Sequence, residues 1–254
     1  MSANAGTRKE RRQARRRQAL QRWVLPVVSR PMRLGAEPIL VFAPHADDET
    51  LGCGGLIALK RRAGCAVTVV FLTDGSRSHE GRAEAPSPEA LAALRREEAR
   101  TALGTLSVPP ESIHFLDFPD GALGNLPQDG RAALQAALAD LLQRYRPALV
   151  FVPHRLDGHA DHTAAYEAVT AAIALDAATS TAVYAYPVWL FWTRNRLFGN
   201  LPGSALAGAY RLPIGSALEQ KRQAMAAYRS QLEVLPPGFV EPQMAPDEYF
   251  FRVR

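Results

Sequence analysis

One apolar run that ends abruptly in a polar cluster constrains the fold of this chain more than any other feature. Residues Ile39 to Phe42 are apolar, and the sequence Pro44-His45-Ala46-Asp47-Asp48-Glu49 follows almost at once. Small residues at 50–55 then lead into a helical pattern that extends to Arg62. A buried strand, a polar turn and a helix in this order are typical of an open α/β sheet, in which ligands bind outside the carboxyl ends of the strands.

The same order of elements recurs along the chain. Apolar runs rich in β-branched residues alternate with segments whose apolar residues recur at helical spacing. This alternation predicts an α/β fold, a Rossmann-like three-layer αβα sandwich with a mostly parallel sheet. We expect irregular structure at 77–88 and 189–206, and we assign no element to the Pro-rich tail that ends in Tyr249-Phe250-Phe251. We expect strands at 39–43, 66–72, 113–116, 148–152 and 182–186, and helices at 51–62, 88–103, 131–144, 159–175 and 216–232.

Positive charge is concentrated at the start of the chain. The 254 residues carry a net charge of +5, but eight Lys and Arg side chains and a single Glu lie between residues 8 and 22. The remainder is therefore slightly acidic, and nucleic acid is not an expected partner of the folded body. We expect residues 1–36 to form a basic extension, partly disordered or helical, and residues 37–254 to form one domain. The arm is either a solvated extension or an electrostatic contact with an anionic membrane surface or with nucleic acid.

Further patterns bear on the compartment. No apolar run approaches the ~18 residues that cross a bilayer, and no apolar segment of the signal-peptide kind follows the charged start. Two cysteines, Cys53 and Cys65, are too few for a disulfide framework. We therefore expect a cytoplasmic protein, or a membrane-peripheral one if the basic arm binds lipid. The pattern gives no indication of oligomeric state.

Polar clusters at the ends of several predicted strands suggest a metal site. In a parallel sheet these ends lie on one edge, so 44–49, 74–76 and 154–162 can converge. His45, Asp48 and one later histidine would form a three-ligand site with an open position for water, which is typical of catalytic zinc. The alternative is a loop histidine beside solvated carboxylates, but the strongly apolar strand immediately before them argues against it.

Two further groups could carry the proton chemistry of such a site. Asp47 precedes Asp48 and should point differently, so its carboxylate could act as a general base on bound water. His159 and His162 lie three residues apart and face the same side of a helix. One of these histidines can bind the metal, and the other can donate a proton or stabilise an oxyanion. Asp157 is either a partner that orients a metal-binding histidine or an ordinary loop cap.

The two polar motifs together resemble those of a known family. The segment 44–49 resembles the Pro/Ala-His-Pro-Asp-Asp-Glu signature of the PIG-L/LmbE-type de-N-acetylases, with Ala46 where that family usually has Pro. The segment 153–162 is similar to the family's second motif, which ends His-x-Asp-His. The resemblance covers roughly residues 37–232, and it implies a Rossmann-like fold, a zinc ion and hydrolysis of N-acetyl groups on glucosamine units. Another divalent metal such as Fe²⁺ is the alternative to zinc. It also implies roles for individual residues: zinc ligands at His45, Asp48 and His162, the general base at Asp47, and the second histidine at His159.

The expected function follows from this resemblance and from the residues together. We expect a metal-dependent hydrolase that removes an acetyl group from an N-acetylglucosamine-type sugar conjugate, a small-molecule partner. The alternative is a zinc hydrolase that acts on another amide of a small-molecule or antibiotic-like substrate. Asp74 and Arg77 lie where they could bind a sugar hydroxyl or an anionic aglycone, and the aromatic segment 189–196 could form a pocket wall. A non-catalytic binding module is disfavoured because every residue that the chemistry needs is present.

Overall fold

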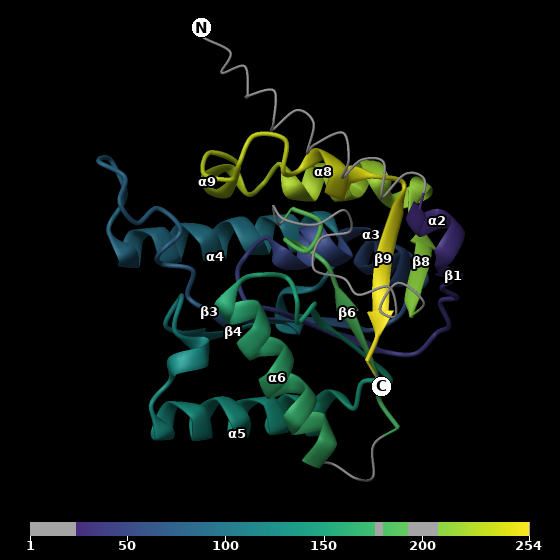
Figure 1. Cartoon of the computed structure of the whole chain (residues 1–254), viewed down its shortest axis with the longest axis horizontal. Coiled ribbons are helices and arrows are strands. Elements are labelled where there is room, and N and C mark those ends of the chain that lie inside the picture. The colour runs from purple at the N-terminus through teal and green to yellow at the C-terminus, as the bar shows by residue number, and fades with distance from the viewer. Residues whose placement is uncertain (1–23, 176–179, 193–207, 254) are drawn as a thin grey trace, which may run out of the picture.

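The fold is a three-layer α/β sandwich, as the sequence predicted (Figure 1). The structure is a computed structural model, and it describes residues 24–175, 180–192 and 208–253. Within these residues one sheet runs in the order β1-β8-β9-β6-β5-β2-β3-β4. Helices α3, α4 and α8 cover one face, and α5 and α6 cover the other (Figure 1).

The bounds of the described elements agree with the predicted ones to within a few residues for most of the chain. The strands are β1 Arg30–Pro31, β2 Ile39–Ala43, β3 Val67–Thr73, β4 Ile113–Phe118, β5 Leu149–Pro153, β6 Ala182–Tyr186, β8 Ala209–Pro213 and β9 Asp247–Arg252. The helices are α2 Leu25–Val28, α3 Asp48–Arg62, α4 Pro88–Thr105, α5 Gln128–Tyr145, α6 Ala160–Leu175, α8 Leu218–Met225 and α9 Arg229–Leu232, with short 3₁₀ turns at 110–112, 123–125, 215–217 and 241–244.

The sheet changes winding direction at β2, and this determines where a site can form. β2 pairs in parallel with β3 on one side and with β5 on the other, so Val41 faces both Val69 and Phe151. β4 and β6 extend this parallel body, and β9 is antiparallel to both of its neighbours, β6 and β8. Ligands of open α/β sheets bind at such a switch point, beyond the carboxyl ends of the strands. The segment after β2 lies at that point.

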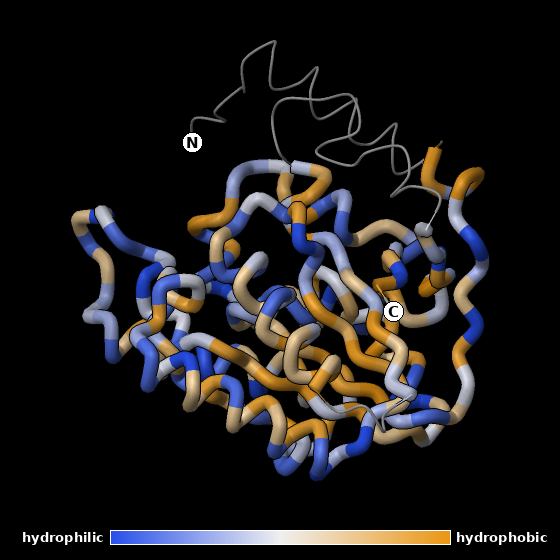
Figure 2. Tube along the Cα trace, turned by 60° about the horizontal axis from the view of Figure 1, so that its bottom comes forward, coloured by the Kyte–Doolittle hydropathy of each residue, from blue (hydrophilic) through white to orange (hydrophobic). Residues whose placement is uncertain are grey.

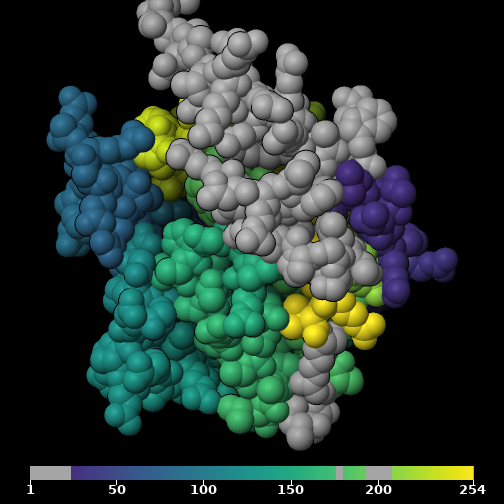
Figure 3. All heavy atoms as spheres, viewed as in Figure 1, coloured from purple at the N-terminus to yellow at the C-terminus, as the bar shows by residue number. Residues whose placement is uncertain are grey.

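The core consists of two apolar layers, one on each face of the sheet. Every residue of β2 and β3 is buried, as expected for central strands of a parallel sheet. Apolar side chains of α3, α4 and α8 pack on one face, and those of α5 and α6 pack on the other. In Figure 2 the interior strands are mostly coloured hydrophobic, whereas the outer helices alternate between hydrophilic and hydrophobic. The space-filling view shows α5 and α6 on the lower part of one side, with the start of α4 above them (Figure 3).

Small residues in α3 allow the helix to approach the sheet closely. A Cβ atom on Gly52 would lie 2.2 Å from Cδ2 of Tyr186, a fully buried side chain. Tyr186 cannot move away easily, because its hydroxyl donates a hydrogen bond to the backbone oxygen of Phe42 at 2.8 Å. This contact sets the distance between β2 and the helix that follows it, and thereby the position of the first turn of α3.

Three expectations about the C-terminal third of the chain need correction. The helix expected at 216–232 is wrong as a single element: α8 ends at Met225, and α9 begins only at Arg229. The tail contains an unassigned strand, β9, and β8 at 209–213 was also not expected. The segment 193–206 lies outside the described residues.

At the start of the chain, most of the predicted extension, including the basic arm, also lies outside the described residues. The division at 36/37 stays a prediction, although β1 within the predicted extension pairs with β8. None of the helices in the described ranges has the length and hydropathy needed to cross a membrane.

Candidate active site

The turn between β2 and α3 presents a histidine and two aspartates at the switch point of the sheet. His45 follows β2, Asp48 is the first residue of α3, and both are buried. Asp47 precedes the helix with a φ of 135°, which is rare for a residue other than glycine. Such backbone strain persists only where the surrounding structure imposes it, and it is concentrated at functional sites.

The three residues expected to bind metal converge on one carboxylate oxygen. Oδ2 of Asp48 lies 3.1 Å from Nδ1 of His45 and 3.2 Å from Nε2 of His162. The approach of Nε2 of His162 to Asp48 is not a hydrogen bond, so this buried nitrogen has no hydrogen-bond partner among the described residues. Two nitrogen donors and one carboxylate oxygen suit a divalent cation such as zinc, which would satisfy the unpartnered Nε2. The donor set therefore fits a bound metal ion.

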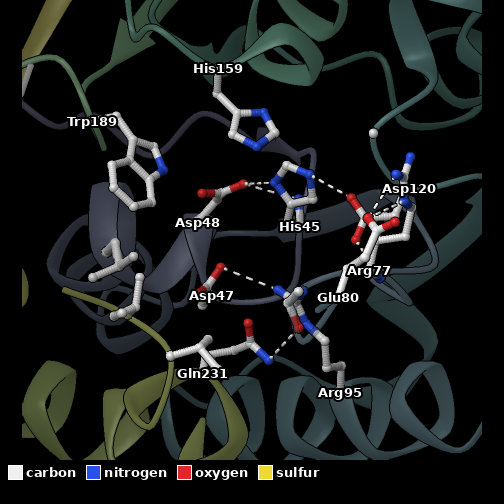
Figure 4. A pocket seen from close by; sticks show the side chains of 15 residues that line it. His45, Asp47, Asp48, Arg77, Glu80, Arg95, Asp120, His159, Trp189 and Gln231 are labelled. Carbon is white, nitrogen blue, oxygen red and sulfur yellow. Dashed lines mark hydrogen bonds and ion pairs between the residues drawn. The ribbon is translucent and has the colours of Figure 1, made fainter. Parts of the chain in front are cut away.

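His159 is the residue directly before α6, and its ring lies beside those of His45 and His162. One ring nitrogen from each of His45, His159 and His162 lies within 4.8 Å of the others. The backbone N–H of Asp161 donates to Nδ1 of His159 at 3.3 Å, which assigns the ring hydrogen to Nε2. His159 thus presents an N–H donor to the cavity, and Figure 4 shows its ring above Asp48 and His45.

The outer nitrogen of each expected histidine ligand contacts a carboxylate. Nε2 of His45 lies 3.2 Å from Asp120 and 3.2 Å from Asp161. Nδ1 of His162 lies 2.7 Å from Asp157. Carboxylates in this position orient a metal-binding histidine and raise its basicity. Asp157 also accepts hydrogen bonds from backbone N–H groups at 188 and 190, so it acts both as a loop cap and as a partner of histidine.

The carboxylates favour positive charge on both histidines. Burial lowers the pKa of His45, but its hydrogen bonds to carboxylates, that to Asp120 first, hold this pKa well above the usual value. Burial likewise opposes charge on His162, but the charge of Asp48 and the hydrogen bond to Asp157 raise its pKa to about 9. The pKa of Asp48 is lowered well below its usual value by the same histidines, against the effect of burial. The site therefore provides a strongly negative environment, in which a cation would be stabilised.

Asp47 lies beside the metal-binding group but is not part of it. Its nearest charged partner is Arg95, with Nη2 3.6 Å from Oδ1 of Asp47. Arg95 also donates to the backbone oxygens of Ala46 and Gly75 at 2.8 and 3.1 Å, so the guanidinium holds the strained turn. Burial raises the pKa of Asp47 to about 8, and the positive charge of Arg95 partly offsets this rise. A cation at the neighbouring ligands would favour the ionised carboxylate further.

A cavity of about 400 Å³ opens next to these groups. This volume lies in the range of small-molecule sites. One wall is polar and includes Arg77, Glu80 and Asp120, and the opposite side carries the indole of Trp189 (Figure 4). Asp47, Asp48 and Gln231 also line the cavity.

The two residues expected to bind substrate differ in position. Arg77 lines the cavity, with an exposed side chain that also pairs with Glu80 at 2.7 Å. Asp74 does not line it: Oδ1 of Asp74 accepts hydrogen bonds from the backbone N–H groups of Ser76 and Asp120. Of the aromatic segment 189–196, Trp189 lines the cavity, and residues 193–196 lie outside the described residues.

Sequence reasoning missed Asp120, Asp161, Arg95 and Gln231 as parts of the site. Asp120 and Asp161 contact His45, and Arg95 contacts Asp47. The sequence did carry a signal for Asp120, because Asp117-Phe118-Pro119-Asp120-Gly121 is another polar cluster after a strand. Gln231, in the short helix α9, lines the cavity although no sequence pattern assigned it a chemical role.

Comparisons with known proteins show which family this chain resembles. The sequence matches the family described as GlcNAc-PI de-N-acetylase (PIG-L) over residues 40–173. A 1D-myo-inositol 2-acetamido-2-deoxy-alpha-D-glucopyranoside deacetylase of Tsukamurella paurometabola is 30% identical, and the match covers 79% of this chain and 84% of that protein. The uncharacterized deacetylase YaiS of Escherichia coli is 31% identical over 51% of this chain and 64% of its own length, just under two thirds.

Solved structures share the fold. The conserved protein TT1542 from Thermus thermophilus superposes with a TM-score of 0.63 at 28% identity, covering 86% of this chain and 95% of that one. GalB, a 4-carboxy-2-hydroxymuconate hydratase from Pseudomonas putida, gives a TM-score of 0.66 at 22% identity over 86% and 96% of the two chains. Since a hydratase shares the fold, fold alone does not identify the reaction.

Proposed function

The chain belongs to the GlcNAc-PI de-N-acetylase (PIG-L) family, and we propose that it is a metal-dependent hydrolase that removes the acetyl group from an N-acetylglucosamine-type sugar conjugate. One observation carries the proposal: a nitrogen of His45 and a nitrogen of His162 lie 3.1 and 3.2 Å from the same oxygen of Asp48, next to Asp47. His45, Asp47 and Asp48 line a cavity of about 400 Å³. The relative from Tsukamurella paurometabola, whose name specifies a 2-acetamido sugar, supports the substrate class.

His45, Asp48 and His162 would hold the metal. We propose zinc, with Fe²⁺ as the alternative, because the donor set of two imidazoles and one carboxylate suits either ion. When bound, the ion would polarise the acetamide carbonyl and lower the pKa of a water molecule. Asp157 and Asp120 keep the two imidazoles in the orientation that this binding needs.

Asp47 would move the proton of the reaction, and His159 would stabilise the charge that develops. Asp47 accepts a proton from the attacking water as the new C–O bond forms at the acetyl carbon. The C–N bond then breaks, and the leaving nitrogen takes up a proton, so that acetate and a free amine are released. The N–H of His159 faces the cavity and would stabilise the oxyanion, because burial lowers the pKa of His159 to about 4 and keeps its ring neutral. The proton for the leaving nitrogen is then the one that Asp47 took from water.

The cavity wall opposite Trp189 would receive the sugar hydroxyls. The guanidinium of Arg77 is exposed to this space and is our candidate for direct contact with substrate. Asp74 would contribute through the backbone, because it binds the N–H groups of the loops that carry Arg77 and Asp120.

The test is acetate release together with metal content. The purified chain is assayed on a panel of N-acetylglucosamine conjugates and on carbamoyl and acyl-amino compounds, and bound metal is measured in the same samples. Asp47→Asn should retain the metal and lose about 10²- to 10⁴-fold in kcat, the usual contribution of a general base. Asp140→Asn, on the exposed side of α5, is the matched control. If Asp47→Asn keeps full activity, the proposed base is wrong; if only the other amides are cleaved, the substrate class is wrong.

A further inference from the structure

A chain of hydrogen bonds fixes the orientation of the side-chain amide of Gln231, which lines the cavity. Ser230 binds Glu98 twice: its backbone N–H donates to Oε1 at 2.8 Å, and its hydroxyl donates to Oε2 at 2.6 Å. A carboxylate only accepts hydrogen bonds, so the hydrogen of the Ser230 hydroxyl is committed to Glu98. The hydroxyl oxygen can then only accept from Gln231, whose Nε2 lies 2.8 Å away.

This polarity decides which end of the Gln231 amide faces the cavity. Nε2 is held by Ser230 and also donates to the hydroxyl of Ser78 at 3.3 Å, so both of its hydrogens are used. Oε1 therefore points the other way, and it has no hydrogen-bond partner among the described residues. Figure 4 shows this oxygen directed into the cavity on the side of Asp47, while the nitrogen turns away.

Gln231 presents this oxygen to the cavity from an otherwise packed position. Its side chain is almost completely buried, with 3% of the residue exposed. Oε1 is not sealed from solvent, so in the free protein it accepts from water, and a substrate donor would take the place of that water. The position beside Asp47 places the acceptor within the region where the scissile group would lie.

We infer that Gln231 is a specificity-determining residue whose Oε1 accepts a hydrogen bond from a neutral donor of the substrate next to the scissile acetamide. The inference rests on the proposed deacetylation. Two donors on an N-acetylglucosamine unit have the required chemistry: the acetamide N–H itself and the adjacent 3-hydroxyl. A site of this kind would disfavour analogues that lack the donor, because the bound analogue would displace solvent from Oε1 without replacing the hydrogen bond.

The experiment compares variants and substrates in one set. Gln231→Met keeps the side-chain length and removes the acceptor. Gln231→Asn keeps the amide but shortens the side chain by one methylene, which moves the oxygen away from the cavity. Gln223→Met, on the exposed side of α8, is the matched control. Each protein is assayed on methyl N-acetylglucosaminide, on its 3-deoxy analogue, and on the analogue with an acetate ester at carbon 2, and thermal unfolding is measured in parallel.

We expect Gln231→Met and Gln231→Asn to lower kcat/KM for the parent substrate by about tenfold, the effect of one hydrogen bond in a buried site. For one of the two analogues, wild type and variant should then have equal kcat/KM, which identifies the donor. A loss equal to that of Gln223→Met overturns the inference, and so does a loss that persists undiminished with both analogues. If the wild-type chain deacetylates no N-acetyl sugar at all, the proposed function fails and the inference fails with it.

Discussion

Asp157 accepts a hydrogen bond from His162, with Oδ2 2.7 Å from Nδ1, and both side chains are completely buried. The bond places a hydrogen on Nδ1 and leaves Nε2 to bind a cation. Asp157 is itself fixed, because Oδ1 accepts the backbone N–H groups of Val188 and Leu190 at 3.1 and 2.6 Å. The loop after β6 therefore determines the orientation of a histidine on α6.

Asp157→Asn should weaken metal binding without removing a proposed ligand. The amide oxygen can still accept from Val188 and Leu190, so its nitrogen would face His162 and force the hydrogen onto Nε2. We expect about 10- to 100-fold lower metal affinity, the usual cost of losing such an orienting partner. Metal content after dialysis against graded chelator concentrations measures it, with Asp140→Asn as the control. Unchanged affinity in a folded Asp157→Asn variant would contradict the role of this bond.

Gly52→Ala should destabilise the fold, because its Cβ would lie 2.2 Å from a buried ring carbon of Tyr186. Overpacking of this kind costs about 1–3 kcal/mol in free energy of unfolding. Gly104→Ala is the matched control: in α4 no atom lies within 4 Å of the added Cβ, and the helix should gain up to about 1 kcal/mol. Chemical denaturation of both variants measures the difference. Equal stabilities would mean that α3 can move away from the sheet at little cost.

The parallel body of the fold could be predicted because its signals are local. Strands such as β2 and β3 are continuous apolar runs, and each is followed by a polar turn and a helix of ordinary spacing. The convergence of residues 44–49 with residues 154–162 follows from the rule that the carboxyl ends of parallel strands share one edge. The contact between His45 and Asp120 depends instead on the conformation of the loop after β4. No local sequence pattern specifies that conformation.

The structure of the C-terminal third was harder to predict, because tertiary contacts there override the local helix propensity. Residues 218–232 contain neither Gly nor Pro, and their composition favours one helix. The chain nevertheless breaks at Tyr228, whose hydroxyl donates to the buried Glu49 at 2.6 Å. The break also brings Ser230 to Glu98. These bonds join segments far apart in the sequence, so helix propensity could not predict them.

His154 should make the fold sensitive to mild acid. Burial lowers its pKa to about 4, from an ordinary value of 6.5 that the unfolded chain retains. Between these values the unfolded state binds a proton that the folded state does not, so the free energy of unfolding falls as pH drops from about 6.5 to 4, by roughly 2–3 kcal/mol. His154→Gln should remove this part of the pH dependence, as measured by urea denaturation at pH 7 and pH 4.5. The same slope in wild type and variant would contradict the assignment.

The buried ion pair of Lys221 and Glu248 connects α8 and β9, near the C-terminus, to α3. Nζ of Lys221 donates to Oε1 of Glu248 at 2.8 Å and to the backbone oxygen of Leu51 at 2.9 Å. Glu248 accepts the backbone N–H groups of Gly55 and Leu56 at 2.7 and 2.8 Å, so both charges bind the helix that begins with Asp48.

Removing one partner of this pair should cost far more than removing both. Lys221→Met leaves the carboxylate of Glu248 buried without a counter-charge, and we expect a loss of about 3–5 kcal/mol in free energy of unfolding. The double variant with Glu248→Gln should recover a large part of that loss, because no unpaired charge then remains. Glu167→Gln, which breaks an exposed pair with Arg155 at 3.7 Å, is the control and should change stability by less than about 1 kcal/mol. If the double variant is as unstable as the sum of the single ones, the two residues act independently on α3.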